Sequence, residues 1–190
     1  FSNNGASGFD GNAKQLSGGF FQCRFNGNTG QGTRLASAMV HVCCEAMNNS
    51  SHGFFFSSGS TTIFAHCVAH NNTVDGFYMI DRSFVIHCVA DNCASGINFV
   101  GALEAQHGFF NRLTNNTTYG IELVDGTYKS FNGYNGFRGN GTAEINSTGT
   151  VVLQDLQDTN VSLGADGYAD AASDDFSLDD DSEQRRVQLS

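Results

Sequence analysis

The stretch from residue 53 to residue 123 contains one short pattern four times: Gly53-Phe-Phe-Phe56, Gly76-Phe-Tyr-Met79, Gly96-Ile-Asn-Phe99 and Gly120-Ile-Glu-Leu123. With Gly8 and Gly32 added, these glycines recur at intervals of 24, 21, 23, 20 and 24 residues. A second column lies eight or nine residues before most of the glycines and reads Cys23, Cys44, Cys67, Cys88 and Asn111, with steps of 21, 23, 21 and 23 residues. Two columns that keep nearly the same step indicate a repeat protein.

Around the cysteine column the side chains alternate with a period of two, which is the signature of β-strands. The alternation predicts that the residues two before and two after the column point inward: Phe21, Val42, Ala65, Ile86 and Phe109, then Phe25, Ala46, Ala69, Ala90 and Leu113. A unit of such short strands buries its apolar face only by stacking on its neighbours, so the repeat predicts a solenoid of β-coils. A β-sandwich is the main alternative, but it gives no reason for cysteines and glycines to recur in register.

Asparagine forms a third column, four to five residues after the cysteine column, with Asn49, Asn72, Asn92 and Asn116 as members. Asn accepts the left-handed backbone of a turn, and stacked amides hydrogen-bond to one another along a solenoid axis. These coils, with inward stacks and an Asn ladder, resemble the right-handed parallel β-helix of the pectate-lyase-like superfamily, nearest in character to tailspike-type and adhesin-type extracellular proteins. The resemblance implies an all-β solenoid of about six or seven coils of 20–24 residues, followed by an acidic C-terminal segment.

The repeat divides the chain into two parts. Residues 1–163 are expected to form the β-helix, with the best-defined coils in 8–125 and irregular closing strands in 126–163. Residues 164–190 hold eight of the nineteen acidic residues and are expected to form an acidic tail or a cap. The stretch 170–178 resembles the segment that closes extracellular β-helix domains, which implies that Phe176 and Leu178 cover the last coil. A disordered acidic tail is the alternative.

Charge and motifs exclude several function classes. The net charge is −10 with nine basic residues, whereas nucleic-acid binding needs clustered Lys and Arg, so no nucleic-acid partner is expected. No window approaches the ~18 consecutive apolar residues that span a membrane. No P-loop, dinucleotide fingerprint, G-x-S-x-G or H-E-x-x-H motif occurs, so no cofactor and no catalytic residue is expected. Asp75, Asp81 and Asp91 are scattered among turns and strand ends, where acids are usually solvated.

The six cysteines do not form the pattern of a disulfide framework. Cys23, Cys44, Cys67 and Cys88 share the inward column, and a spacing of ~4.8 Å between coils brings neighbouring pairs within disulfide reach. Free cysteine also packs well as a small buried hydrophobe, so a reduced stack is favoured and disulfides are the alternative. Cys43 is expected outward and Cys93 in a turn, and neither has the spacing of a zinc or redox motif.

The densest group of possible metal ligands is His66, His70, His87 and Asp91. The columns place His66 beside His87 and, four residues further along, His70 beside Asp91. Imidazole and carboxylate ligands suit Zn, Ni or Cu. Because about 13 Å separates strand positions i and i+4, only two of the four side chains can share an ion. Exposed histidines without a metal are therefore favoured, and a metal-binding surface is a distant alternative.

Aromatic side chains are expected on the outside of the coils: Phe55, Tyr78, Phe110, Tyr119, Tyr128 and Tyr134. Such rings stack on sugars or form subunit interfaces. Open solenoid ends need caps or partners, which favours a non-catalytic structural protein of an extracellular, virion or cell surface. A fibre, spike or adhesin segment that forms a homo-oligomer or filament fits this reasoning. The alternative is a carbohydrate-binding or polysaccharide-degrading β-helix module, with glycans as partners, which as an enzyme would be a lyase or a glycoside hydrolase.

Overall fold

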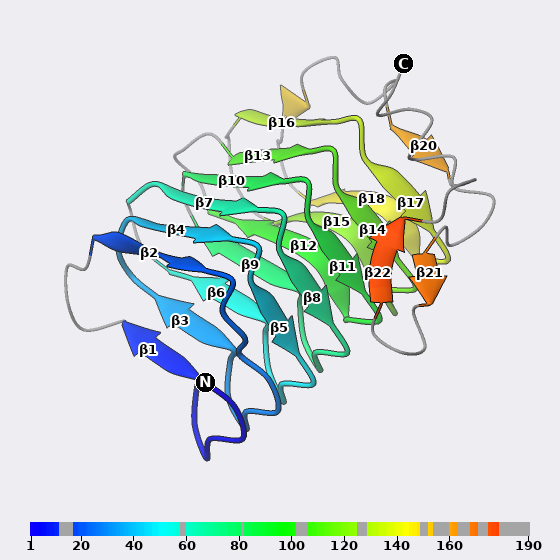
Figure 1. Ribbon diagram of the computed structural model, residues 1–190. Helices are drawn as coiled ribbons and strands as arrows, with labels where there is room; N and C mark the ends of the chain where they lie inside the picture. Colours follow the sequence, from blue (N-terminus) through cyan, green and yellow to red (C-terminus); the bar gives the residue numbers. More distant parts are fainter. Residues whose placement is uncertain are drawn as a thin grey trace.

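A computed structural model describes residues 1–11, 17–57, 60–80, 82–101, 106–124, 129–148, 152–153, 160–162, 168–170 and 175–178 of the chain. Their regular secondary structure is all β, and parallel strands stack into a solenoid with three sheets along its length (Figure 1). The predicted all-β parallel β-helix is therefore confirmed. No helix long and apolar enough to cross a membrane occurs in these residues.

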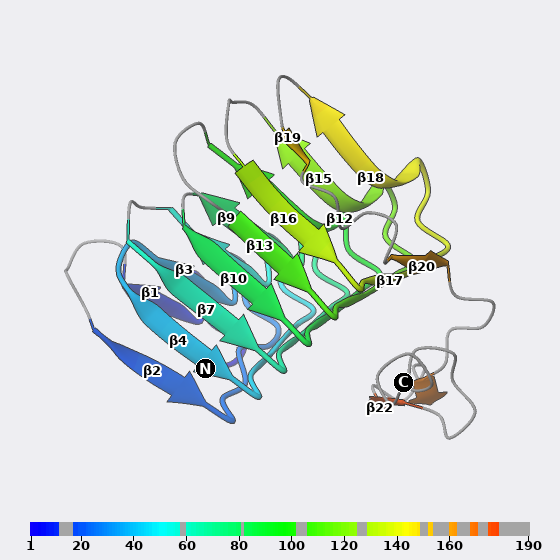
Figure 2. The same cartoon turned by 90° about the horizontal axis from the view of Figure 1, so that it is seen from above.

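The chain visits sheets A, B and C in turn, so that a complete coil adds one strand to each sheet. Sheet A contains β1 (Phe9–Gly11), β3 (Thr33–Leu35), β6 (Phe54–Phe56), β9 (Phe77–Ile80), β12 (Ser95–Val100), β15 (Tyr119–Val124) and β18 (Ala143–Thr148). Sheet B, whose strands lie side by side in Figure 2, contains β2 (Gly18–Phe21), β4 (Met39–Val42), β7 (Thr62–Ala65), β10 (Ser83–Ile86), β13 (Gln106–Phe109), β16 (Lys129–Gly133) and β19 (Val152–Leu153). Sheet C contains β5 (Glu45–Met47), β8 (Val68–His70), β11 (Val89–Asp91), β14 (Arg112–Thr114), β17 (Gly136–Arg138) and β20 (Val161–Ser162).

Two short strands of the predicted acidic tail are also described. β21 (Tyr168–Asp170) and β22 (Asp175–Leu178) pair with each other in antiparallel fashion, in a sheet of their own. The side chains of Phe176 and Leu178 lie outside the described residues, so their role in covering the last coil stays a prediction.

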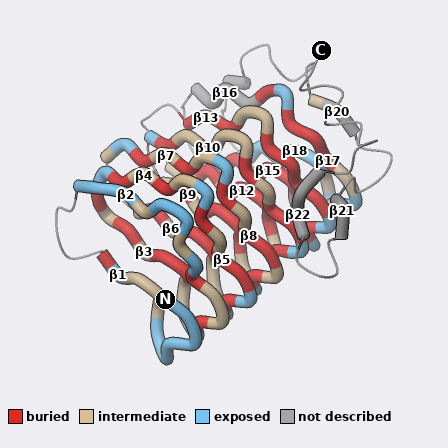
Figure 3. Tube along the Cα trace, viewed as in Figure 1, coloured by how far each residue is buried: buried red, intermediate tan, exposed pale blue. Residues whose placement is uncertain are grey.

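Inward side chains of the three sheets form one continuous apolar core, seen as the buried segments in Figure 3. The first residue after four of the column glycines is completely buried: Phe54, Phe77, Ile97 and Ile121. The glycines themselves leave room for neighbouring coils, because a Cβ added to Gly53 would lie 2.8 Å from the carbonyl oxygen of Gly76. Contacts that short do not occur for real side chains, so this corner of the coil requires glycine.

The predicted side-chain alternation is wrong for sheet B. Phe21 is 65% exposed, and Val42, Ala65, Ile86 and Phe109 lie half-buried on the outer face, whereas His41, Phe64 and Val85 point into the core. The cause is a residue with a left-handed backbone directly before each member of the cysteine column. These residues are Gln22, Cys43, His66, His87 and Phe110, with φ between 52° and 57°. A left-handed residue turns the chain, so a period of two does not continue through it.

A ladder of buried asparagines follows sheet C. Asn49 Nδ2 donates to Asn72 Oδ1 at 2.9 Å, and the same pattern joins Asn28 to Asn49 and Asn116 to Asn140. Asn92 does not belong to this ladder, which corrects the predicted third column. It is exposed, and it lies in an outer column of left-handed residues with Asn48, Asn71 and Asn115. Cys93 occupies the ladder position instead.

Replacing Cys93 with asparagine is expected to raise the free energy of unfolding by about 1–2 kcal/mol. Asn72 Nδ2 now faces the Cys93 sulfur at 3.9 Å, and the same sulfur lies 3.9 Å from the carbonyl oxygen of Ala69. An amide at this position offers an acceptor to Asn72 and a donor to Ala69. Urea unfolding of Cys93→Asn beside Cys93→Ala measures the gain, and equal stability of the two variants would show that the ladder does not need this amide.

The six cysteines are free thiols. Cys44, Cys67 and Cys88 are buried in the core, Cys23 is half-buried and Cys43 is exposed. Burial raises the pKa of the Cys67 thiol well above its ordinary value, and it raises the pKa of Cys93 to about 12. Since the thiolate is the reactive form of cysteine, these buried side chains act as packing groups.

Candidate functional site

Polar and aromatic side chains form two columns on the outer face of sheet A. In-register pairing of parallel strands stacks Arg34, Phe55, Tyr78, Asn98 and Glu122 in the first column. The second column consists of residues that directly precede column glycines: His52, Asp75 and Ser95. Because neighbouring strands lie ~4.8 Å apart, side chains of successive coils touch one another. We call these eight residues the sheet A face.

Asp75 is held between two coils at the centre of the sheet A face and is 4% exposed. Its Oδ1 accepts a hydrogen bond from the backbone nitrogen of Ser95 at 3.2 Å, and its Oδ2 accepts one from Asn98 Nδ2 at 3.2 Å. His52 Nδ1 lies 3.2 Å from Asp75 Oδ2 and 3.4 Å from the Asp75 backbone nitrogen. We assign a proton to Nδ1, because its contact with the Asp75 carboxylate is the shorter of the two and a carboxylate is a strong hydrogen-bond acceptor.

Glu122 is a second carboxylate of the sheet A face, in a different environment from Asp75. It is half-buried, and its Oε2 accepts a hydrogen bond from Ser95 Oγ at 3.0 Å. Burial and, to a smaller extent, the charge of Asp75 raise the pKa of Glu122 above its ordinary value, against the opposing effect of the Ser95 hydrogen bond. Ser95 therefore connects the two carboxylates, through its backbone nitrogen to Asp75 and through its hydroxyl to Glu122.

Aromatic rings lie near Asp75 on the sheet A face. Phe55 and Tyr78 are stacked with ring centroids 5.0 Å apart and planes 4° apart, and the His52 ring lies 4.7 Å from that of Tyr78. Burial and the charge of Asp75 raise the pKa of Tyr78, so its hydroxyl stays protonated at neutral pH. An apolar ring surface next to hydrogen-bonding groups suits a ligand that has both CH and OH surfaces.

The predicted metal ligands lie in two separate pairs. The His66 and His87 rings stack at 5.1 Å on the corner between sheets B and C, where burial and then the charge of His66 lower the pKa of His87. His70 Nδ1 lies 3.0 Å from Asp91 Oδ2, and both residues are buried, so the expected solvated state of Asp91 is wrong. The expected solvated state is also wrong for Asp75, which is 4% exposed. Asp81 lies outside the described residues. No group of three or more ligands that could hold a metal ion occurs in the described part of the chain.

The predicted outer aromatics are divided between two surfaces. Phe55 and Tyr78 belong to the sheet A face, whereas Phe110 stacks on His87 at 4.9 Å and on Tyr134 at 5.1 Å. The rings of His66, His87, Phe110 and Tyr134 thus form one ladder along the corner between sheets B and C, away from the carboxylates. Tyr119 is half-buried at the start of β15, and Tyr128 lies outside the described residues.

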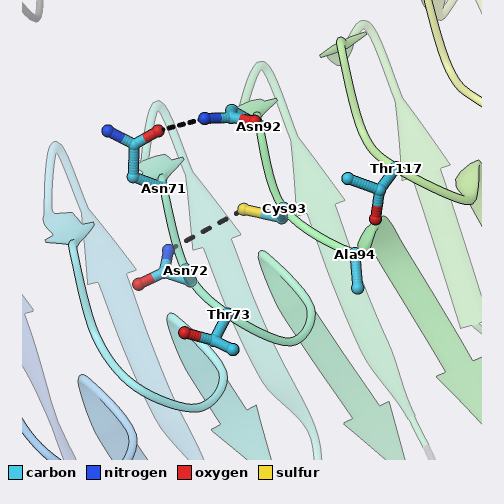
Figure 4. A pocket seen from close by; sticks show the side chains of 7 residues that line it. All are labelled: Asn71, Asn72, Thr73, Asn92, Cys93, Ala94 and Thr117. Atoms are coloured by element: carbon cyan, nitrogen blue, oxygen red, sulfur yellow. Dashed lines mark hydrogen bonds between the residues drawn. The ribbon is translucent and has the colours of Figure 1, made fainter.

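A shallow hollow of about 490 Å³ lies in the turns after sheet C (Figure 4). It is lined by amides, hydroxyls and one buried thiol: Asn71, Asn72, Thr73, Asn92, Cys93, Ala94 and Thr117. Asn92 Nδ2 donates to Asn71 Oδ1 across it, so two of its amides bond to each other. The hollow offers hydrogen bonds but no carboxylate or imidazole, unlike the sheet A face.

Sequence reasoning found the two rings of the sheet A face but missed His52, Asp75 and Glu122. The missed signal lies in the glycine column, because His52 and Asp75 each directly precede one of its members. Aligning the repeats on these glycines would have placed both side chains in one column, beside the column of Tyr78 and Glu122.

Comparisons with known proteins concern the fold. The family described as "Right handed beta helix region" matches residues 1–106. No curated protein matches the sequence. Among solved structures, the catalytic domain of a GH87 alpha-1,3-glucanase in complex with tetrasaccharides is similar over 84% of this chain and 44% of that chain, at 9% identity and a TM-score of 0.42. This chain thus spans less than half of that domain's chain, and a likeness of this size does not assign it an activity.

These comparisons correct the leading functional prediction from the sequence. The prediction of a fibre, spike or adhesin segment is wrong, because the family match is to a right-handed β-helix region and gives no indication of a structural fibre protein. The predicted homo-oligomer or filament and the predicted extracellular location stay predictions.

Proposed function

Because the chain belongs to the right-handed β-helix family, we propose that it is a carbohydrate-active module that binds a glycan across the sheet A face. The β-helix fold leaves the outer face of each sheet free to carry a binding site. One observation carries the proposal. The stacked rings of Phe55 and Tyr78 lie in one column with Asn98 and Glu122, and Asp75, which is linked to Glu122 through Ser95, lies beside this column.

The two parts of this surface match the two kinds of surface on a sugar. Ring carbons of Phe55 and Tyr78 provide apolar contact for CH groups. The amide of Asn98 and the carboxyl group of Glu122 provide hydrogen bonds for hydroxyl groups, while the buried Asp75 holds Asn98 in place. Since these side chains repeat along the solenoid axis at one per coil, the surface extends in one direction, as a polymer requires.

Replacing Tyr78 with alanine is expected to weaken glycan binding about tenfold, which corresponds to the ~1.4 kcal/mol that one aromatic contact contributes. The matched control is Phe110→Ala, which removes a stacked ring from the corner between sheets B and C. Affinity electrophoresis against soluble polysaccharides gives both dissociation constants, and thermal unfolding verifies that both variants fold. Equal losses in the two variants, or no binding by the unmodified chain, would exclude the sheet A face as the binding surface.

Cleavage of the bound glycan is a second candidate function, favoured by the unlike environments of Asp75 and Glu122. Glycosidases use one protonated and one ionised carboxyl group, and burial raises the pKa of Glu122 above its ordinary value. In this reading Glu122 donates the proton to the leaving oxygen. We expect Glu122→Gln to abolish the release of reducing ends and to change binding less than about threefold. Unchanged release, or no release by the unmodified chain, rejects cleavage and leaves the binding proposal intact.

A further inference from the structure

We propose that the glycan bound by the sheet A face carries no carboxylate or sulfate groups and is held through hydroxyl groups that donate hydrogen bonds. This inference rests on the proposed function and specifies its ligand class. Two independent properties of the surface support it: the sign of its charges and the orientation of its hydrogen-bonding groups.

The charge of the surface disfavours an acidic polymer. Asp75 and Glu122 contribute carboxyl groups at its centre, and the whole chain has a net charge of −10. Arg34 is the only Lys or Arg among the eight residues of the sheet A face, and its Nη1 lies 3.6 Å from Asp10 Oδ2. A uronic acid polymer would therefore bring repeated carboxylates next to like charges, with Arg34 at the end of the column as the one Lys or Arg of this surface.

The centre of the surface offers acceptor oxygens, on Asn98 and Glu122. Asn98 Nδ2 already donates to Asp75, whereas Asn98 Oδ1 is buried and has no hydrogen-bond partner among the described residues. A buried acceptor without a partner is unfavourable, and because Oδ1 is itself covered, a ligand hydroxyl reaches it once the Asn98 side chain rotates toward solvent. The carboxylate of Glu122 is a further acceptor beside it in the same column. An ionised carboxylate or sulfate cannot donate to these oxygens, whereas a sugar hydroxyl can.

Matched pairs of polymers test the inference directly. Polygalacturonate and alginate are compared with their carboxyl-reduced forms, which keep the linkages and lose the charge, together with a panel of neutral glucans and galactans. At about 0.01 M salt, where the Debye length is ~30 Å, we expect the charged polymers to bind at least tenfold more weakly than their reduced or neutral counterparts. At about 1 M salt, where the Debye length is ~3 Å, the difference is expected to fall below about threefold.

A charge-reversing variant separates the local effect from the net charge. Glu122→Lys is expected to improve binding of polygalacturonate or alginate at low salt by about tenfold. Glu45→Lys changes the net charge equally but lies on sheet C, where Glu45 pairs with Arg24, and is expected to leave the preference unchanged.

Each remaining outcome has one meaning. Charged polymers that bind as tightly as their reduced forms, or tighter, overturn the inference and leave the proposed function standing. An equal effect of the two Lys variants also overturns it, because the preference would then come from the net charge of the chain. No binding of any polymer, charged or neutral, refutes the proposed function itself.

Discussion

Replacing Asn72 with alanine is expected to lower the free energy of unfolding by about 3–5 kcal/mol, since three buried backbone or amide groups each lose one hydrogen bond at once. Asn72 is 2% exposed. Its Oδ1 accepts hydrogen bonds from both the backbone nitrogen and Nδ2 of Asn49, and its Nδ2 donates to the carbonyl oxygen of Ala46 at 2.8 Å. Alanine satisfies none of these groups, and no water enters a packed ladder to replace the amide without further cost.

Equilibrium unfolding in urea measures this loss, because the free energy falls linearly with denaturant concentration. Asn48→Gly is the matched control: Asn48 is the exposed neighbour of the ladder residue Asn49, and glycine keeps its left-handed backbone, with φ of 55°. We expect the control to change stability by less than about 1 kcal/mol. A loss for Asn72→Ala no larger than that of the control would mean that the ladder does not stabilise the coils.

Acidification is expected to destabilise the protein through one buried histidine, His41. Its ring is fully buried against the ring of Phe64, 4.5 Å away, and neither ring nitrogen has a hydrogen-bond partner in the described residues. Burial lowers the pKa of His41 from 6.5 to about 3. Between these two values the unfolded chain binds a proton that the folded chain does not, so stability falls as the pH falls. At ~1.4 kcal/mol per pKa unit the loss is about 2 kcal/mol at pH 5 and about 5 kcal/mol below pH 3.

The test is the pH dependence of urea unfolding between pH 7 and pH 4 for the unmodified chain and for His41→Phe. Phenylalanine keeps the ring contact with Phe64 and cannot take up a proton, so its stability is expected to vary less over this range. His66→Gln serves as the control, since His66 is exposed and its removal leaves the buried ring in place. The assignment to His41 is refuted by a pH dependence that His41→Phe does not reduce.

The parts of the fold that sequence predicts are those with one strict requirement per coil. Gly53 and Gly76 face the backbone of the next coil, and Cys67 occupies a small interior space. The glycine column and the cysteine column can therefore be recognised from the residue types alone. The predicted inward and outward faces of sheet B are reversed because Cys43 and His66 have left-handed backbones, which glycine or asparagine usually adopt. Nothing in their side chains signals this conformation.

The candidate site was harder to predict because its contacts cross from coil to coil. Asp75 meets the backbone of Ser95, 20 residues away, and the side chain of Asn98, 23 residues away, whereas Ser95 meets Glu122 at 27 residues. Coil lengths vary from 20 to 24 residues, so counting along the chain does not give these pairings. The rings of Phe55 and Tyr78 were found from their outward positions, without the carboxylates beside them.

A crystal structure of the chain soaked with a neutral oligosaccharide tests the proposed binding surface most directly. We expect the sugar on the outer face of sheet A, with a hydroxyl group within hydrogen-bond distance of Asn98 Oδ1 and a further one at Glu122, and with CH groups against the ring of Tyr78. A sugar ordered instead in the hollow between Asn71 and Asn92, or along the rings of His87 and Phe110, would contradict the assignment of the site to sheet A.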